Sequence, residues 1–584
     1  MRRLIPVLFT LTILVYLFPS LLHSQTFSKV TPRLQQQIQE SASDETLLVW
    51  VYFADKGDNL SEKLNQVEAT LTEKAYRRRL RNRGPNHLVD YYDIPVNSEY
   101  VNDVASLVNR VRHKSRWLNA VSVEATPQQI QTLSQRNYVK KLDRVFTKTE
   151  PLPVKIEGEL TAPPLEKSES PHSFNYGFSY DQINQINVIP LHDMGLNGSG
   201  VTIAMLDAGF NNLQHEALSQ LNILHTWDFV NGDSIVSDEP GQMGTGNHGT
   251  YTLSALAGFQ EGSLIGPAFG ADFLLAKTEN TDWERHIEED AWVAGAEWAD
   301  SLGADIISSS LGYRDGFTNG EPNYTWQDMD GNTTIVAIGA DIAASRGILV
   351  VNSAGNEGPA NPPENTLVSP ADGDSVLAVG AVTASGSRAS FSSMGPTSDG
   401  QIKPDVMARG VSTACASPYD PHGYVSVSGT SLSCPLVAGA AALVLQANPN
   451  LTNMEIIEAL HQTASQANTP DNEYGWGIIN AFDAAMLYNG IPVVGEPPTT
   501  FELYQNYPNP FNASTTILFF LPETAAYRVE VYNLLGEKIA TLREGVKSGF
   551  DVFVWDASNL SSGIYFIALQ SKGQIKVKKA MLIK

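Results

Sequence analysis

The run of residues 436–445 constrains the fold of this chain most strongly, because it is apolar on every side and rich in small residues. A helix of that composition has no polar face to turn to water, so the pattern predicts a helix buried within the protein. Residues 428–435 precede it directly and would place Ser431 at the helix N-terminus. Unpaired backbone N–H groups and the helix dipole there favour negative charge, which suits a serine that must lose its proton. Ser and Thr also cap helices routinely, so this stretch alone is equally compatible with a plain N-cap.

A nucleophilic serine also needs a base and a group that orients the base, and the chain offers both. The apolar run 201–207 predicts a buried parallel strand ending in Asp207, and active sites of open α/β sheets collect at such strand ends. His248 opens a second run of small residues that is predicted to be helical. A single histidine there is more often structural, but Asp, His and Ser in this order, each in a fitting context, are hard to obtain by chance. Ser431 lacks the Gly-x-Ser-x-Gly elbow of α/β-hydrolases, since Ser433 occupies the last position.

The sequence around these three residues is distinctive. Residues 207–209 read Asp-Ala-Gly, residues 248–250 read His-Gly-Thr, and residues 429–435 read Gly-Thr-Ser-Leu-Ser-Cys-Pro. These resemble the Asp-(Ser/Thr)-Gly, His-Gly-Thr and Gly-Thr-Ser-Met-Ala-x-Pro motifs of subtilisin-type (subtilase) serine peptidases, which share the chain order Asp, His, Ser. Residues 306–312 resemble the family's substrate-binding edge strand, and residues 350–358 the strand and turn that carry its oxyanion-hole asparagine.

The resemblance covers roughly residues 176–488 and implies roles for particular side chains. The implied catalytic residues are Asp207, His248, Ser431 and the oxyanion-hole residue Asn356. The implied substrate-binding residues are Ser310, Leu311 and Gly312, along an extended substrate, and Ala354 and Gly355, at the floor of the main specificity pocket. The sequence departs from the family pattern at Ala208, Tyr251, Leu432 and Ser433. None of these departures removes a catalytic group, but Ala208 and Tyr251 bear on the packing around Asp207 and His248.

The central part of the chain, residues 176–489, alternates strand and helix signals, as a doubly wound parallel sheet of the α/β class should. The predicted strands are 201–207, 272–277, 305–311, 348–353 and 376–382. The predicted helices are 249–258, 285–302, 334–345, 431–447 and 453–464. Together with the resemblance, this pattern predicts a subtilisin-like peptidase domain.

The N-terminal part contains three predicted segments. Residues 1–25 have a basic tip and an apolar run and predict a secretory signal peptide, with a retained membrane anchor as the alternative. Residues 26–150 predict a small α/β domain, and its end resembles the inhibitory and chaperone-like propeptides of subtilases. Residues 151–175 contain five prolines and predict an extended linker where maturation cleavage is expected. We interpret the basic run 77–83 as a solvated helix face rather than as a nucleic-acid site.

The C-terminal part changes character after a proline-rich linker at residues 490–500. Residues 501–584 contain short alternating runs separated by turns, which predict a small all-β sandwich. The stretches 504–512, 562–565 and 576–580 resemble the C-terminal sorting domain of type IX secretion cargo. That resemblance implies the type IX secretion machinery as a partner and a secreted or cell-surface location. A carbohydrate-binding or adhesion sandwich is the alternative.

Composition bears on three further questions: nucleic-acid binding, disulfide bonds and metal sites. The net charge of −24 makes nucleic acid an unlikely partner. Cys415 and Cys434 are the only cysteines, so no disulfide framework holds the fold, and whether the two pair is left open. Subtilases often bind calcium in acidic, glycine-rich loops such as 228–246, but no ordered ligand pattern is present there. We therefore expect no required cofactor, leave calcium possible and assign no metal site.

These features predict a secreted serine endopeptidase that acts on proteins or peptides and is inhibited by its own propeptide. Two other functions remain open. One is a catalytically inactive subtilase fold that serves as a binding or adhesion module, although all four candidate catalytic residues are present. The other is a serine hydrolase of a different kind, such as an esterase, against which the missing elbow and the residue order argue.

Overall fold

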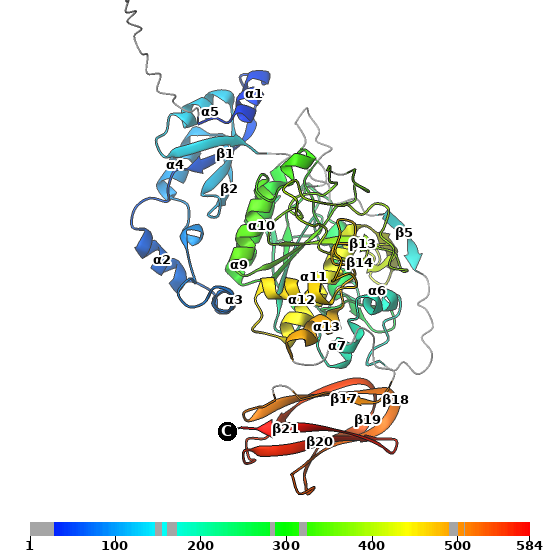
Figure 1. Ribbon diagram of the computed structural model, residues 1–584. Helices are drawn as coiled ribbons and strands as arrows, with labels where there is room; N and C mark the ends of the chain where they lie inside the picture. The colour runs from blue at the N-terminus through cyan, green and yellow to red at the C-terminus, as the bar shows by residue number, and fades with distance from the viewer. Residues whose placement is uncertain are drawn as a thin grey trace, which may run out of the picture.

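The computed structural model describes residues 29–145, 155–160, 172–280, 287–314, 324–361, 363–489, 500–506 and 509–583 (Figure 1). It contains an N-terminal α/β region, a large central region and a C-terminal all-β region, as the sequence predicts. The predicted signal peptide at residues 1–25 lies outside the described residues. The predicted linker at residues 490–500 lies outside them as well, except for its last residue.

A parallel sheet of seven strands forms the middle of the central region, in the order β14-β13-β12-β11-β6-β10-β7. Its strands are β6 (Thr202–Asp207), β7 (Asn222–Asp228), β10 (Asp272–Lys277), β11 (Ile306–Ser309), β12 (Leu349–Ser353), β13 (Val376–Val382) and β14 (Val406–Arg409). All neighbouring strands run parallel. The chain enters at β6, forms the edge strand β7, returns to place β10 between β6 and β7, and then builds the other side from β11. The strand order therefore reverses between β6 and β11, which is where ligands bind in open α/β sheets.

Helices cover both faces of this sheet, because successive side chains of a buried strand point to opposite faces. Ile203 and Met205 of β6 belong to one buried apolar cluster, and Ala204 and Leu206 belong to another. The first cluster includes side chains of α6 (Tyr180–Gln185), α7 (Ile189–Asp193), α8 (His248–Ala257), α11 (Thr430–Ala447), α12 (Asn453–Thr463) and α13 (Ala481–Met486). The second includes side chains of α9 (Ile287–Leu302) and α10 (Ile335–Ser345). Every predicted central strand and helix lies within two residues of an observed one.

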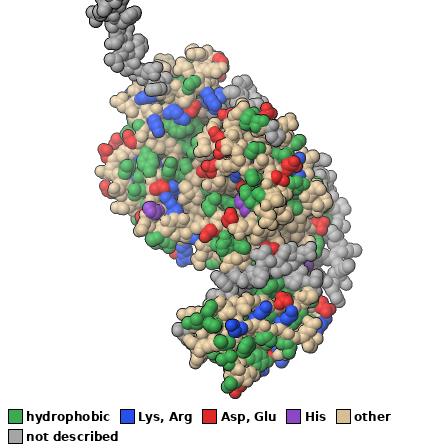
Figure 2. Space-filling view, in the orientation of Figure 1, with side chains coloured by type: hydrophobic (Ala, Val, Ile, Leu, Met, Phe, Trp, Pro, Cys, Tyr) green, Lys and Arg blue, Asp and Glu red, His purple; other side chains and the backbone are tan. Residues whose placement is uncertain are grey.

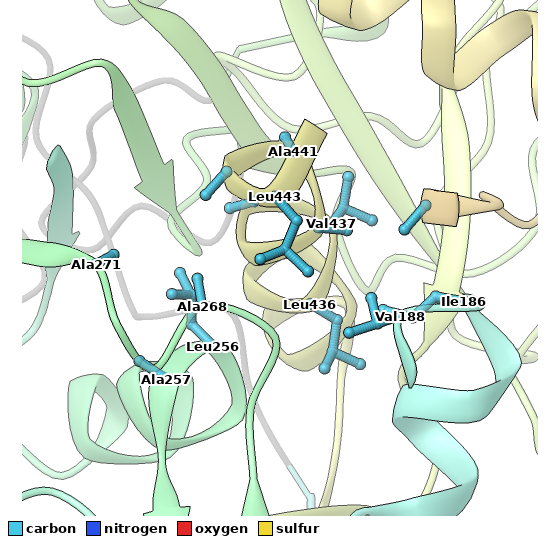
Figure 3. Close-up of a cluster of buried hydrophobic side chains, with 14 of the residues drawn as sticks. Ile186, Val188, Leu256, Ala257, Ala268, Ala271, Leu436, Val437, Ala441 and Leu443 are labelled. Atoms are coloured by element: carbon cyan, nitrogen blue, oxygen red, sulfur yellow. The ribbon is translucent and has the colours of Figure 1, made fainter. Parts of the chain in front are cut away.

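Helix α11 is the buried helix that the apolar run predicts. Figure 3 shows its side chains, among them Leu436 and Leu443, packed with residues that include Ile186 and Leu256. Small residues allow this close packing: a Cβ atom on Gly439 would lie 2.9 Å from Cβ of Pro267. Within the described part of the chain, α11 is also the one helix long and apolar enough to cross a membrane by composition, yet here it is a core helix.

The N-terminal region folds around a four-stranded antiparallel sheet in the order β2-β3-β1-β4. Its elements are α1 (Pro32–Glu40), β1 (Leu47–Phe53), α2 (Leu60–Ala69), α3 (Glu73–Arg83), η1 (Tyr91–Asp93), α4 (Ser98–Leu107), β2 (Arg110–Ser115), β3 (Ala120–Ala125), α5 (Pro127–Ser134) and β4 (Val139–Arg144). One face of the sheet packs on helices of its own region. From the other face, Trp50 and Ala120 enter the cluster that α9 and α10 form, and Trp117, in the turn between β2 and β3, enters the same cluster. The region therefore has a core of its own and also an apolar contact with the central region.

The basic run 77–83 is not a solvated helix face, so that interpretation is wrong. It lies in α3, and Arg78 and Arg79 are 1% and 2% exposed. Both are paired with Asp300 of α9, which is more than two hundred residues away in the chain. Local charge density could not reveal a partner so distant in sequence.

Residues 155–160 fall within the predicted linker 151–175, but they form a strand, β5 (Lys155–Leu160). It pairs antiparallel with β16 (Tyr424–Ser428), whose other neighbour is β15 (Thr413–Ala416). The exposed edge of β16 offers backbone groups to any extended segment, so a proline-rich sequence nearby can become a strand there. The remaining predicted linker residues up to 171 lie outside the description.

The C-terminal region is all-β, as predicted, but two of its strands are much longer than the sequence suggests. It contains β17 (Glu502–Leu503), β18 (Ser514–Tyr532), β19 (Lys538–Asp556), β20 (Gly563–Ser571) and β21 (Gln574–Leu582), joined in one hydrogen-bonded sheet. In Figure 1, β20 and β21 (red) lie below β17 to β19. Tyr504 and Leu518 belong to the main core cluster of the central region, and Lys547 Nζ donates to the carbonyl of Asp193 at 3.1 Å. The all-β region is thus in contact with the central region.

Candidate active site

The predicted catalytic residues come from the carboxyl edge of the parallel sheet and from two helix N-termini. Asp207 is the last residue of β6, and His248 is the first residue of α8. Ser431 is the second residue of α11, and Asn356 lies in the turn that follows β12. The paired strands align Leu206 with Ser309 and Ser309 with Asn352, so the loops that leave β6, β11 and β12 begin side by side.

Asp207 and His248 are in direct contact. Nδ1 of His248 lies 2.6 Å from Oδ1 of Asp207. The same carboxylate accepts hydrogen bonds from the backbone N–H of Ala208 at 2.7 Å and from the hydroxyl of Thr252 at 2.9 Å. Asp207 is 1% exposed and His248 is 7% exposed, so solvent has little access to the pair. The carboxylate is held from three sides, which fixes the plane of the imidazole.

The other ring nitrogen of His248 has a different environment. With Nδ1 donating to Asp207, Nε2 is the acceptor of the neutral ring. It is buried and has no hydrogen-bond partner among the residues that the structure describes. A base in this state can take a proton from a hydroxyl that approaches it, and such contacts are often long in proteins without substrate.

Ser431 is fully buried, and its backbone carbonyl has an unusual partner. In a regular helix this carbonyl would accept from the N–H four residues later, but that residue is Pro435, which has no N–H. The hydroxyl of Ser310 donates to the Ser431 carbonyl instead, at 2.9 Å. Ser310 was predicted to bind substrate through its backbone, and the structure gives its side chain this additional contact.

Asn356 is held by the residue before Ser431. Its Oδ1 accepts from both the backbone N–H and the hydroxyl of Thr430, each at 2.9 Å. These two contacts fix the amide plane, with the amino group on the side away from Thr430. The turn also needs Gly355, which has a φ of +117°, and a Cβ there would lie 2.6 Å from the hydroxyl oxygen of Ser393.

The other predicted substrate-binding residues line the same edge of the sheet. Leu311 is buried, and its carbonyl accepts from Nδ2 of Asn352 at 2.9 Å. Gly312 follows it directly along the chain. The Ala354 N–H donates to the Val379 carbonyl at 2.9 Å, and the Ala354 carbonyl accepts from Val368 at 3.2 Å. Contact of these residues with a substrate stays a prediction.

The departures from the family pattern are packing residues in this fold. Tyr251 is 3% exposed and packs in one small cluster with Cys415 and Leu432, which joins the starts of α8 and α11. Burial raises the pKa of Tyr251 to about 12, so its hydroxyl stays protonated. Near Asp207 the hydroxyl donor is Thr252, since Ala208 offers only its backbone N–H. Sequence reasoning missed Thr252, although it lies one helical turn after His248 and therefore on the same helix face.

The two cysteines do not pair. Cys415 and Cys434 are both free and buried. Burial raises the pKa of both thiols, that of Cys434 to about 12. Cys434 Sγ lies 3.4 Å from the carbonyl oxygen of Ser309 and 3.5 Å from that of Val351. It therefore behaves as a small buried side chain beneath the sheet edge.

The acidic loop 228–246 uses its carboxylates internally. Asp228 accepts from the backbone N–H groups of Val230 and Asn231 at 2.7 and 2.9 Å, and lies 3.3 Å from Nζ of Lys277. Over the described residues, no group of three or more Asp, Glu, His or Cys side chains is arranged to hold a metal ion. The carboxylate of Asp228 thus stabilises the loop itself.

Comparison with protein-family models matches three parts of the chain. Residues 198–477 match "Subtilase family", and residues 48–159 match "Peptidase S8 propeptide domain, Bacteroidota". Residues 505–584 match "Secretion system C-terminal sorting domain". The three matches correspond to the central, N-terminal and C-terminal regions of the fold.

Curated proteins with similar sequences are subtilisins. Subtilisin NAT of Bacillus subtilis subsp. natto is 32% identical over 323 residues, which cover 55% of this chain and 74% of that protein. Subtilisin BL of Lederbergia lenta is 33% identical over 300 residues, covering 51% of this chain and 96% of that protein. A subtilisin of Bacillus pumilus is 33% identical over 305 residues, covering 52% and 97%.

Proposed function

Because this chain belongs to the subtilase family and is a secreted serine endopeptidase, we propose that Ser431 is its nucleophile, His248 its general base and Asp207 the group that orients the histidine. The observation that carries this proposal is the 2.6 Å contact between His248 Nδ1 and Asp207 Oδ1. That contact leaves Nε2 of His248 as the hydrogen-bond acceptor of the ring. The ring is held at the carboxyl edge of the parallel sheet, where α11 begins.

In the proposed reaction, Ser431 Oγ attacks the carbonyl carbon of a peptide bond while Nε2 of His248 takes the hydroxyl proton. The ionised Asp207 stabilises the imidazolium that forms. The imidazolium then gives its proton to the leaving amine, and the acyl group stays on Ser431. Water attacks the acyl-enzyme with His248 again as base, which releases the acid product and restores the serine.

Asn356 is proposed to stabilise the negative oxygen of the tetrahedral intermediate. Its Oδ1 is occupied by two hydrogen bonds from Thr430, so the amide group presents its N–H side elsewhere and need not reorient during the reaction. Donors fixed in advance in this way lower the barrier most, since they cost no reorganisation. Removal of one such donor costs roughly 3–4 kcal/mol in subtilisin itself.

The proposed substrates are proteins or peptides in extended form. A substrate would pair as an added strand with the backbone of Ser310, Leu311 and Gly312, and its main side chain would point toward Ala354 and Gly355. Every group in the proposed steps belongs to the chain or to water, so we propose no cofactor for the chemistry. Activity after dialysis against a chelator tests that proposal and reports whether calcium contributes to stability.

The proposal includes partners at both ends of the chain. The N-terminal region would inhibit the enzyme until it is cleaved off, because it packs on α9 and α10 and continues toward β16. The C-terminal sorting domain directs the protein to the cell surface or exterior by type IX secretion, so the secretion machinery is its proposed partner.

The first prediction tests the nucleophile. Ser431→Ala should abolish hydrolysis of casein and labelling by a fluorophosphonate probe, while the fold remains intact. Triad members act as a unit, so Ser431→Ala and the double variant Ser431→Ala/His248→Ala should have nearly equal residual rates. Wild-type turnover by Ser431→Ala would refute the assignment. A wild-type protein that is not labelled would instead be an inactive binding module, and one that cleaves only a short-chain ester would be an esterase.

A further inference from the structure

Helix α3 attaches the N-terminal region to the central region through its positive charges. Of its residues, only Ala75, Arg78 and Arg79 are buried. Arg78 pairs with Asp300 and also donates to the carbonyl of Ala304. Arg79 lies 2.7 Å from the Asp300 carboxylate. The β-sheet of the same region also contacts α9, through apolar side chains such as Trp50 and through polar pairs such as Arg112 with Asp290, which lie 2.9 Å apart.

Two further pairs extend the contact beyond Asp300. Lys74 Nζ lies 2.5 Å from Oδ2 of Asp272, and Arg81 lies 3.0 Å from Oδ1 of Asp305. In each pair the cation belongs to the N-terminal region and the anion to the central region. A cleft of about 570 Å³ remains beside α3, lined partly by Arg77 and Arg81. The helix is therefore held by charged pairs as well as by close packing, since a Cβ atom on Gly303 would lie 2.5 Å from Cβ of Lys74.

Asp300 is the central anion of this contact. It is fully buried and is also paired with Arg116 at 2.8 Å. Burial alone would raise its pKa, but the charges of Arg78, Arg79 and Arg116 lower the pKa to about 2. The carboxylate thus stays ionised at all ordinary pH values, and the arginines compensate its charge.

The α3 contact lies at the opposite end of the sheet from the candidate active site. Asp272 is the first residue of β10, and Asp305 directly precedes β11, so both lie at the amino ends of parallel strands. Lys74 also donates to the hydroxyl of Thr202, the first residue of β6, at 2.6 Å. Asp207 is the last residue of the same strand, about 17 Å away at the usual rise per residue. Figure 1 likewise shows α3 near α12, far from β5.

We propose that Asp272, Asp300 and Asp305 form a docking site for α3, remote from the catalytic cleft, that keeps the N-terminal region bound after the chain is cut between residues 145 and 155. The docking site, referred to below as the remote anchor, fits a basic helix. The charge of α3 supports this occupant: the helix carries six basic residues and one acidic residue, while the whole chain carries a net charge of −24. Blue Lys and Arg side chains also lie over other parts of the N-terminal region, at the upper left of Figure 2. Release of the inhibitor would then require loss of the remote anchor as well as cleavage.

The test uses the full chain with Ser431→Ala and a recognition sequence for an added site-specific protease within residues 146–154. After cutting, the rate at which the N-terminal fragment leaves is measured by size-exclusion chromatography and surface-based binding. Since the added protease makes the cut, the outcome does not depend on the proposed catalytic residues. The result for the remote anchor and the result for the nucleophile can therefore be told apart.

We expect the cut protein to stay together at 0.15 M salt, on the order of physiological ionic strength. Lys74→Gln with Arg81→Gln should speed dissociation by about 3- to 10-fold, since these pairs are partly exposed. Arg78→Gln should speed it by about 100-fold or more, since it leaves a buried carboxylate short of a partner. Rising salt concentration should weaken the wild-type complex more than the double variant.

Arg77→Gln is the matched control, because Arg77 lies on the same helix, carries the same charge and is 76% exposed, and Glu73 is its one ion partner within the part of the chain that the structure describes. It should change the dissociation rate less than about twofold. Equal rates for Arg77→Gln and for Lys74→Gln/Arg81→Gln would overturn the proposal, as would immediate separation of the cut wild-type protein. If Arg78→Gln does not fold, the dissociation rate of Lys74→Gln/Arg81→Gln, compared with that of Arg77→Gln, still tests the proposal.

Discussion

At the scale of single residues, two hydroxyl groups support the candidate site: that of Thr252 donates to Asp207, and that of Ser310 donates to the backbone carbonyl of Ser431. Asp207, His248 and Ser431 could be predicted because each follows a strand or begins a helix in a recognisable motif. The role of Ser310 could not be predicted, because its hydroxyl acts on an element that is distant in the chain. Thr252 was missed although it lies one helical turn after His248, on the same helix face. A motif identifies residues that react, whereas supporting hydrogen bonds depend on how the elements pack.

The contact between Ser310 and the Ser431 carbonyl gives a prediction at this scale. Ser310→Ala removes the hydroxyl that donates to the buried backbone carbonyl of Ser431, and Pro435 has no N–H group that could replace it. We expect a loss of about 1–3 kcal/mol in stability, together with lower kcat at little changed KM. Thermal unfolding and peptide hydrolysis measure the two effects.

Ser308→Ala is the control for Ser310→Ala. Ser308 is also buried, but among the described residues its hydroxyl has a single, distant contact, at 3.9 Å with Cys434 Sγ. Its replacement should therefore cost less in stability and leave kcat unchanged. If both variants behave alike, the Ser310 hydroxyl has no special part in holding Ser431.

At the scale of elements, the pattern of apolar residues predicts the buried strands and helices well and the edge strands of the sheet poorly. β6, β10, β12 and β13 are apolar runs and were predicted within two residues. β7 was missed because it is an edge strand with mostly exposed side chains, which breaks the apolar run. The role of α3 was missed for a different reason: its charges are compensated by α9, and no local pattern contains that information.

Helix α9 also carries a buried acid that should make stability depend on pH. Burial raises the pKa of Glu289 to about 8, although the Tyr324 hydroxyl donates to it at 3.1 Å. The folded pKa lies above the unfolded value, so the folded state binds more protons between pH of about 4.5 and 8. The contribution of Glu289 to the free energy of unfolding should therefore fall as pH rises through that window, by up to about 1.4 kcal/mol per pH unit.

Glu289→Gln should flatten this dependence, because glutamine cannot ionise and keeps an acceptor for Tyr324. The pH dependence is measured as the melting temperature at roughly pH 5 to 9, which covers most of the window above. The measurements use the Ser431→Ala background, which prevents self-digestion. Glu68→Gln, on the surface of α2, is the control and should leave the slope unchanged. A Glu289→Gln protein with the wild-type slope would show that Glu289 is ionised throughout.

At the scale of the whole molecule, the three regions are joined by contacts of different kinds. The N-terminal region contacts the central region through apolar side chains and through several ion pairs, whereas the C-terminal region contributes Tyr504 and Leu518 to the central core cluster. The order of the regions and their fold classes could be predicted from motifs and composition. The contacts between them could not, since each unites residues from separate regions of the chain.

Removal of residues 501–584 should separate export from catalysis. We expect a chain that ends at residue 489 to remain inside the cell and, once purified and freed of its N-terminal region, to hydrolyse casein at the full-length rate. Its melting temperature should be a few degrees lower, because the surface that Tyr504 and Leu518 cover becomes exposed. A soluble, processed catalytic region without activity would contradict this and make the all-β region part of the catalytic fold.

Helix α11 has a consequence for how the protein leaves the cell. An exported chain passes through the inner membrane before it folds, and an apolar segment of about 18 residues risks being retained there as a spanning helix. α11 reaches that length, but alanine, glycine, serine and Pro435 occupy much of it in place of leucine and isoleucine. We therefore expect the small side chains to lower the tendency of this segment to stop in the membrane during export, and in the folded protein they let neighbouring helices approach closely enough to exclude water.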